Sequence, residues 1–126
     1  MEKYIKKRTL SQSFRNAFNG IVFAFKTQLS LKIHFLALIC VIFLAFYLDS
    51  SYYEWLILLT VITGVITLEL VNTSLEQTTD AVTDEYNLFI KRAKDTSSAA
   101  VLIYAIYALI IAALIFGPKI NLMLTQ

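Results

Sequence analysis

Three long apolar runs dominate this chain, and short polar segments separate them. The runs cover residues 31–48, 55–82 and 97–116, and each reaches the length of about 17 residues or more that an α-helix needs to cross a bilayer. A polar turn beginning at Asp49 follows the first run, and Gly117-Pro118, which cannot continue a helix, closes the third. The pattern predicts three transmembrane helices.

The segment at about residues 10–28 has a different pattern. Its apolar side chains recur at intervals of four, three and four residues, so they share one face of a helix, and polar side chains fill the other face. This pattern is typical of a helix that lies in the plane of the membrane surface. The alternative is that its apolar face packs only on the chain's own transmembrane helices. The apolar face comprises Phe14, Phe18, Ile21 and Phe25, and the polar face Arg15, Asn16, Asn19 and Lys26.

The composition supports an all-α integral membrane protein. Of the 126 residues, 58% are hydrophobic and 16% are charged, and the mean hydropathy is +0.67, so a soluble domain of this size lacks the interior to bury them. The net charge of +2 is too small to indicate a nucleic-acid partner. The single cysteine, Cys40, excludes a disulfide framework, and three scattered glycines exclude a phosphate-binding glycine loop.

The basic residues predict an orientation in the membrane. Lys91, Arg92 and Lys94 lie between the second and third runs, whereas the turn after the first run has no Lys or Arg. Because Lys and Arg are retained on the cytoplasmic side, we expect a multi-pass protein of the cell inner (cytoplasmic) membrane, with its N-terminus in the cytoplasm and its C-terminus outside. Seven more basic residues precede or begin the first run: Lys3, Lys6, Lys7, Arg8, Arg15, Lys26 and Lys32.

A stripe of acids leaves the second apolar run. Glu69, Asn72, Glu76 and Asp80 are spaced by three, four and four residues, so on a helix they fall within about 80° on one face. An ionised carboxylate near the acyl region costs on the order of 2.5–3.5 kcal/mol, and such residues are therefore usually functional. The stripe predicts a site at the inner interface of the membrane.

These residue types suit the transfer of a phosphoryl group to a lipid hydroxyl. Glu76 and Asp80 are candidates to hold Mg²⁺ and the polyphosphate of ATP, and Lys94 is a candidate to bind its β- and γ-phosphates. Glu69 lies deeper and is the candidate general base. Two other interpretations remain open: a structural helix bundle joined through the stripe, and an ion or proton pathway through the same acids. For His34, the sole histidine, we expect interfacial hydrogen bonding rather than metal ligation.

The same residues resemble the prokaryotic diacylglycerol kinases, including the closely similar undecaprenol kinases. The resemblance covers nearly the whole chain, and its centre is Glu69-Leu70-Val71-Asn72-Thr73-Ser74-Leu75-Glu76 followed by Asp80. It continues through Glu85-Tyr86-Asn87 and Arg92-Ala93-Lys94-Asp95, and then through Ser97-Ser98-Ala99-Ala100-Val101-Leu102.

The resemblance implies a homotrimer whose active sites are shared between protomers at the cytoplasmic interface and use ATP and Mg²⁺. By position, Glu69 is similar to the family's catalytic base and Glu76 to its magnesium ligand. Asn72 and Ser98 are similar to residues that line the pocket for the lipid hydroxyl. The segment similar to the family's nucleotide-contacting residues comprises Glu85, Tyr86, Asn87, Lys94 and Asp95, with Asn87 in place of a histidine found in some relatives.

Two features distinguish this chain within the resemblance. Gln28 stands where many members have a second metal-binding glutamate, and a neutral amide is a poorer magnesium ligand. Either Glu76 holds the metal with phosphate and water, or Asp80 helps, or the affinity for magnesium is lower. The Leu68-to-Asn72 motif and the ending Gly117-Pro118-Lys119 look more like the undecaprenol kinase branch. We therefore expect undecaprenol as the acceptor, with diacylglycerol as the alternative.

Overall fold

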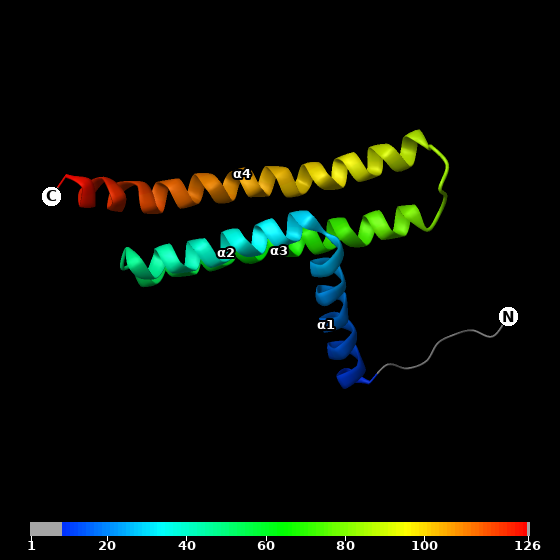
Figure 1. Cartoon of the computed structure of the whole chain (residues 1–126), viewed down its shortest axis with the longest axis horizontal. Coiled ribbons are helices and arrows are strands. Elements are labelled where there is room, and N and C mark those ends of the chain that lie inside the picture. The colour runs from blue at the N-terminus through cyan, green and yellow to red at the C-terminus, as the bar shows by residue number, and fades with distance from the viewer. Residues whose placement is uncertain (1–8, 126) are drawn as a thin grey trace.

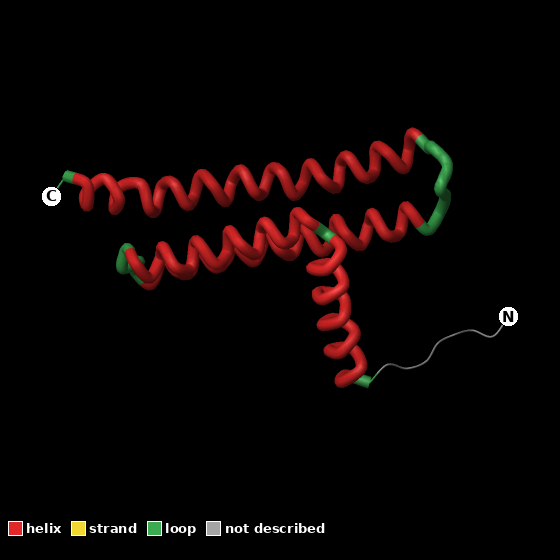
Figure 2. Tube along the Cα trace, in the orientation of Figure 1, coloured by secondary structure: helices red, strands yellow, loops and turns green. Residues whose placement is uncertain are grey.

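The computed structural model describes residues 9–125, and within this range it contains helices and no strands. The four helices are α1 (Leu10–Thr27), α2 (Leu29–Tyr47), α3 (Tyr52–Asp80) and α4 (Leu88–Leu124), joined by short loops (Figure 2). The last three are long and apolar enough to cross a membrane. The expected fold class, an all-α membrane protein with three spans, is therefore confirmed. The basic residues Lys3, Lys6, Lys7 and Arg8, which contributed to the predicted orientation, lie outside the described residues.

The three long helices run side by side, and α1 projects away from them (Figure 1). Both α2 and α4 pack mainly on α3 and touch each other little, so α3 is the centre of the fold. The C-terminal end of α3 and the N-terminal end of α4 extend past the level at which α1 meets α2 (Figure 1). If α1 lies on the membrane surface, this end of the α3–α4 pair stands in the aqueous phase.

The N-terminal part of the aromatic face of α1 does not pack on the rest of the chain, whereas Phe25 packs edge-on against Phe35 of α2. Phe14 and Phe18 are 71% and 65% exposed, whereas Ala24 on another side of α1 is buried. The groove between α1 and α3 is lined by residues that include Gly20, Ile21 and Leu70. The exposed aromatic face is what a helix at a membrane surface requires, and its interfacial location stays a prediction.

Helix α4 differs from the expectation at both of its ends. It begins at Leu88 rather than near residue 97, because the Asn87 side chain accepts hydrogen bonds from the backbone N–H groups of Phe89 and Ile90, at 2.9 and 3.3 Å. The basic segment before the third apolar run is therefore mostly helical rather than a loop. The helix also continues through Pro118 to Leu124. A proline removes one helical N–H, and membrane helices tolerate this loss when neighbouring groups compensate.

The continued end of α4 brings Lys119 to the opposite end of the bundle from α1. Its Nζ lies 2.8 Å from Oε2 of Glu54 at the start of α3 and donates to the backbone oxygen of Asp49 at 3.2 Å. Ser51 and Glu54 also form a capping box that begins α3, with the Glu54 carboxylate accepting from the Ser51 N–H at 2.6 Å. These contacts tie the α2–α3 turn to α4.

In the middle of the bundle, α3 and α4 approach closely at Gly64. A Cβ atom at this position would overlap the ring of Tyr104 on α4. Because the backbone is bare here, the Tyr104 ring lies directly against α3. Most of the remaining large apolar side chains are exposed, as expected of helices that face lipid or further protein rather than water.

Candidate functional site

The Glu69 carboxylate is the deepest polar group of the site. The residue is only 2% exposed and lies on the face of α3 that meets α2. The Ser30 hydroxyl donates a hydrogen bond to its Oε1, and Nε2 of His34 lies 3.9 Å from its Oε2. Ser30 and His34 are four residues apart and so share one face of α2. An unpartnered buried carboxylate costs on the order of several kcal/mol, and these two side chains offset part of that cost.

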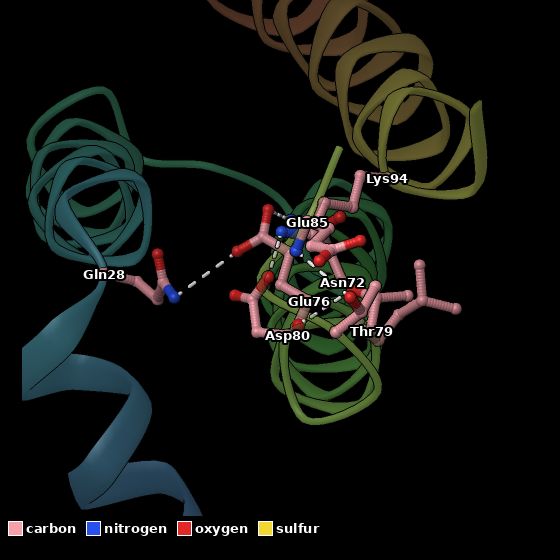
Figure 3. Close-up of polar contacts among 9 residues, drawn as sticks. Gln28, Asn72, Glu76, Thr79, Asp80, Glu85 and Lys94 are labelled. Atoms are coloured by element: carbon pink, nitrogen blue, oxygen red, sulfur yellow. Dashed lines mark hydrogen bonds and ion pairs between the residues drawn. The ribbon is translucent and has the colours of Figure 1, made fainter. Parts of the chain in front are cut away.

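One and two helical turns further along α3, Asn72 and Glu76 form the second part of the site. The Asn72 Nδ2 donates to Oε1 of Glu76 at 3.1 Å, and Nε2 of Gln28 approaches Oε2 of Glu76 at 3.5 Å (Figure 3). Gln28 stands at the junction between α1 and α2. Among the described residues, the buried Oδ1 of Asn72 has no hydrogen-bond partner. Such an acceptor costs about 1–3 kcal/mol and so favours a donor from outside the chain.

The side chains of Glu69, Asn72 and Glu76, together with their neighbours on α2 and α4, line one pocket of about 300 Å³. Its polar members come from three different helices, and apolar residues of α4 close the remaining wall. Beside it, an apolar cavity of about 280 Å³ lies between the three spans. His34 and Ala105 line both spaces, so the polar pocket adjoins the apolar cavity. The polar lining residues are Ser30, His34, Glu69, Asn72, Glu76 and Ser98.

Asp80 does not line this pocket, although it lies on the same stripe. It stands 11 residues after Glu69, about 16 Å further along the helix axis. There its carboxylate pairs with the Lys94 ammonium group on α4. The side chains are 59% and 33% exposed, and an ion pair with this exposure contributes no more than about 1 kcal/mol. Because this ion pair is weak, Lys94 can exchange Asp80 for a more highly charged anion.

The other predicted nucleotide-contacting residues lie around the α3–α4 loop. Asp95 pairs with Lys91 on the surface of α4 at 2.6 Å, and Tyr86 is 80% exposed. The backbone N–H of Glu85 donates to the Thr83 hydroxyl at 3.0 Å. The Asn87 side chain caps α4, which explains why an asparagine serves at this position. These residues do not line the polar pocket, and they lie on the end of α3–α4 that extends past α1.

The sequence interpretation missed the partnership of Ser30 and His34 with Glu69. The available signal was a pair of hydrogen-bonding side chains four residues apart at the start of an otherwise apolar helix. That signal identifies a polar face of α2 but not the residue that it meets. Among the described residues, His34 lies beside the Glu69 carboxylate, and its interfacial hydrogen-bonding role stays a prediction.

The donor set around Glu76 decides whether this site suits the predicted magnesium ion. Residues 9–125 contain no group of three or more His, Cys, Asp or Glu side chains able to hold a metal. Glu76 supplies one carboxylate, with amides at Gln28 and Asn72. Magnesium is often held by one or two carboxylates together with substrate phosphates and water. The residues therefore fit a magnesium ion that arrives with a nucleotide better than a resident metal.

Comparison with known proteins agrees with this geometry. The family model for prokaryotic diacylglycerol kinase matches residues 15–116. The undecaprenol kinase of Bacillus subtilis is 37% identical over 109 residues, which cover 86% of this chain and 89% of that protein. A diacylglycerol kinase of Synechocystis sp. is 37% identical over 113 residues, covering 88% and 65% of the two chains. A diacylglycerol kinase of Helicobacter pylori is 38% identical over 76 residues, which cover 60% of this chain and 59% of that protein.

The family match and the three candidate spans identify a membrane lipid kinase. The chain belongs to the prokaryotic diacylglycerol kinase family. The expectation of a lipid kinase is thereby confirmed, and ATP is the phosphoryl donor that this class implies.

Proposed function

We propose that this protein transfers the γ-phosphoryl group of magnesium-bound ATP to the hydroxyl group of undecaprenol, giving undecaprenyl phosphate. The observation that carries the proposal is the polar pocket itself. It combines a buried carboxylate, Glu69, with the unpartnered Oδ1 of Asn72, and it adjoins an apolar cavity. A lipid alcohol has the two matching parts, a hydroxyl head and a hydrocarbon tail.

The head of the acceptor is expected beside Glu69. A hydroxyl group donates one hydrogen bond and accepts others. In the pocket it finds acceptors on Glu69 and Asn72 and a donor in the Ser98 hydroxyl. As the hydroxyl oxygen attacks the γ-phosphorus, Glu69 takes the hydroxyl proton, and the leaving oxygen departs with ADP. The tail extends into the apolar cavity, past Ala105, and so stays out of water.

The nucleotide is expected at the end of α3–α4 that extends past α1. Glu76 would hold the magnesium ion, with Gln28 as a weak second ligand, and the ion neutralises charge on the phosphates. The Lys94 ammonium would exchange Asp80 for the β- and γ-phosphates, since charge-assisted contacts to phosphate are the stronger ones. Asp80, Glu85, Tyr86, Asn87 and Asp95 would contact the remainder of the nucleotide.

Undecaprenol is preferred because an undecaprenol kinase is matched over 86% of this chain and 89% of its own length. The alternative acceptor is diacylglycerol, which would give phosphatidic acid, since two further relatives are diacylglycerol kinases. The polar pocket does not discriminate between them, because both offer one hydroxyl to Glu69. The hydrocarbon tail and its cavity would have to make the distinction.

The test is phosphorylation of the two lipids by the purified protein. With radiolabelled magnesium ATP, label is expected in the organic phase with undecaprenol, and more slowly with diacylglycerol. Faster labelling of diacylglycerol would reverse the choice of acceptor. If neither lipid is labelled by well-folded protein, the kinase proposal fails. Ion flux into liposomes would then support the pathway interpretation, and its absence would support the structural bundle.

The membrane-facing side of α3 supports assembly with further copies of this chain, as a homotrimer with shared sites. Thr60, Thr63 and Thr67 are exposed at helical spacing in the middle of this span. Small hydroxylated residues of this kind are favoured where membrane helices pack on one another. Cross-linking in mild detergent is expected to stop at the trimer. A monodisperse and active monomer would contradict this. The inner membrane, with a cytoplasmic N-terminus, is part of the same proposal.

A further inference from the structure

Glu69 and His34 differ in their access to the outside of the protein. The Glu69 side chain is 3% exposed, whereas the His34 side chain is 21% exposed. A general base receives one proton in every turnover and must lose it before the next. Glu69 has almost no contact with the surroundings through which to lose it directly. The proton therefore needs an intermediate group that touches both the base and the outside.

His34 meets this requirement by position and by chemistry. Its Nε2 lies 3.9 Å from Oε2 of Glu69, which exceeds hydrogen-bond length by about 1 Å, a gap that a small ring movement closes. Imidazole has two ring nitrogens, so it takes a proton at one and releases a proton from the other. Ser30 donates to the other carboxylate oxygen, Oε1. The hydroxyl thereby holds Oε2 toward His34.

We infer that Ser30, His34 and Glu69 form a proton relay, in which Ser30 orients the carboxylate and His34 carries its proton out of the site. The inference rests on the proposed function and adds a route for the product proton. The O–H bond of the acceptor breaks, its oxygen bonds to the γ-phosphorus, and the bond to ADP breaks with its electron pair on ADP. The proton moves to Glu69, then to Nε2 of neutral His34, and a proton leaves from Nδ1 to interfacial water.

Few other titratable groups face this relay. Besides His34 and Glu69, the only titratable residue that lines the described pocket is Glu76, which accepts hydrogen bonds from Asn72 and Gln28. The wall from α4 contributes Ser98 and apolar residues. On α1 and α2, the charged side chains Arg15, Lys26 and Lys32 are exposed. A pH dependence that disappears with His34 is therefore assigned to His34.

The experiment compares His34→Gln, His34→Ala and Ser30→Ala with wild type. His34→Gln is expected to lower kcat about 10- to 100-fold, with KM for ATP and lipid nearly unchanged. The reason is that Glu69 still takes the proton of the acceptor hydroxyl but loses it slowly before the next turnover. Wild-type kcat is expected to fall at acid pH, because a protonated His34 cannot take the proton from Glu69, and the His34→Gln profile should lack this fall. Added imidazole is expected to raise the rate of His34→Ala several-fold.

Ser30→Ala is expected to lower kcat by a smaller factor and to keep the acid-side fall. Cys40→Ala, an exposed change on the same helix, is the matched control and should behave as wild type. Binding of a nucleotide analogue checks that each variant is folded, and His34→Asn replaces His34→Gln if the latter fails this check.

Three results would overturn the relay: wild-type kcat in His34→Gln, an acid-side fall that persists in it, or a loss confined to KM for the lipid. Failure of imidazole to raise the rate of His34→Ala would also count against it. An inactive wild type would instead refute the proposed function, so the two failures are distinguishable.

Discussion

Replacement of Glu69 by glutamine is expected to reduce kcat by about 10²- to 10⁴-fold. The amide cannot take the proton of the acceptor hydroxyl, so the loss falls on the transition state. Binding of magnesium ATP should be nearly unchanged, since Glu69 lies deeper than Glu76 and does not contact it among the described contacts. Single-turnover rates and binding of an ATP analogue measure the two effects separately.

The fold of the Glu69→Gln variant is expected to survive. The amide oxygen of glutamine can still accept the Ser30 hydrogen bond, and the substitution removes a charge from a site that is 98% buried. Thermal unfolding in detergent should therefore show a Tm no lower than that of wild type. If turnover were lost because the variant unfolds, Tm and nucleotide binding would fall together, and the assignment of Glu69 as base would have no support.

Replacement of Glu76 by glutamine is expected to raise the magnesium concentration for half-maximal rate at least about tenfold and to lower turnover as well. Glu76 accepts hydrogen bonds from the neutral amides of Gln28 and Asn72. Neither of these neighbours can replace its negative charge as a metal ligand. Magnesium titrations of the rate, together with binding of an ATP analogue, measure the effect.

Gln28→Glu and Asp80→Asn are the matched variants for this prediction. A carboxylate at position 28 would stand close to Glu76 and should lower the half-maximal magnesium concentration. Asp80 pairs with Lys94 outside the polar pocket, so Asp80→Asn should change KM for ATP more than the magnesium dependence. If Asp80→Asn shifts the magnesium dependence and Glu76→Gln does not, the metal ligand is Asp80.

Much of the fold can be predicted from the chain because a bilayer restricts what can cross it. Spanning segments must satisfy their own backbone hydrogen bonds and present apolar side chains, so the three spans are visible as runs of apolar residues. The ends of α4 were less predictable. A cap by Asn87 extends the helix toward the polar segment, and the loss of one N–H at Pro118 is tolerated, so the helix extends beyond the apolar run at both ends.

The part of the candidate site that lies on one helix could be predicted for a similar reason. Glu69, Asn72 and Glu76 follow helical periodicity, and they do line one pocket. Asp80 has the same angular position, yet its distance along the axis places it beyond the pocket and beside Lys94. Periodicity gives the angular position of a residue around its own helix. Which residue it contacts depends on where the adjacent helix lies along the helix axis.

The sequence by itself therefore determined the three spans and the polar stripe on the second of them, and its resemblance to a known family indicated the class of chemistry. Only the tertiary structure decided that Ser30 and His34 meet Glu69, that Gln28 meets Glu76, and that the polar pocket adjoins an apolar cavity. The physical reason lies in α2, which is apolar on nearly every side. Its rotation and height against α3 are set by packing between the helices, and no periodic pattern in its sequence records them.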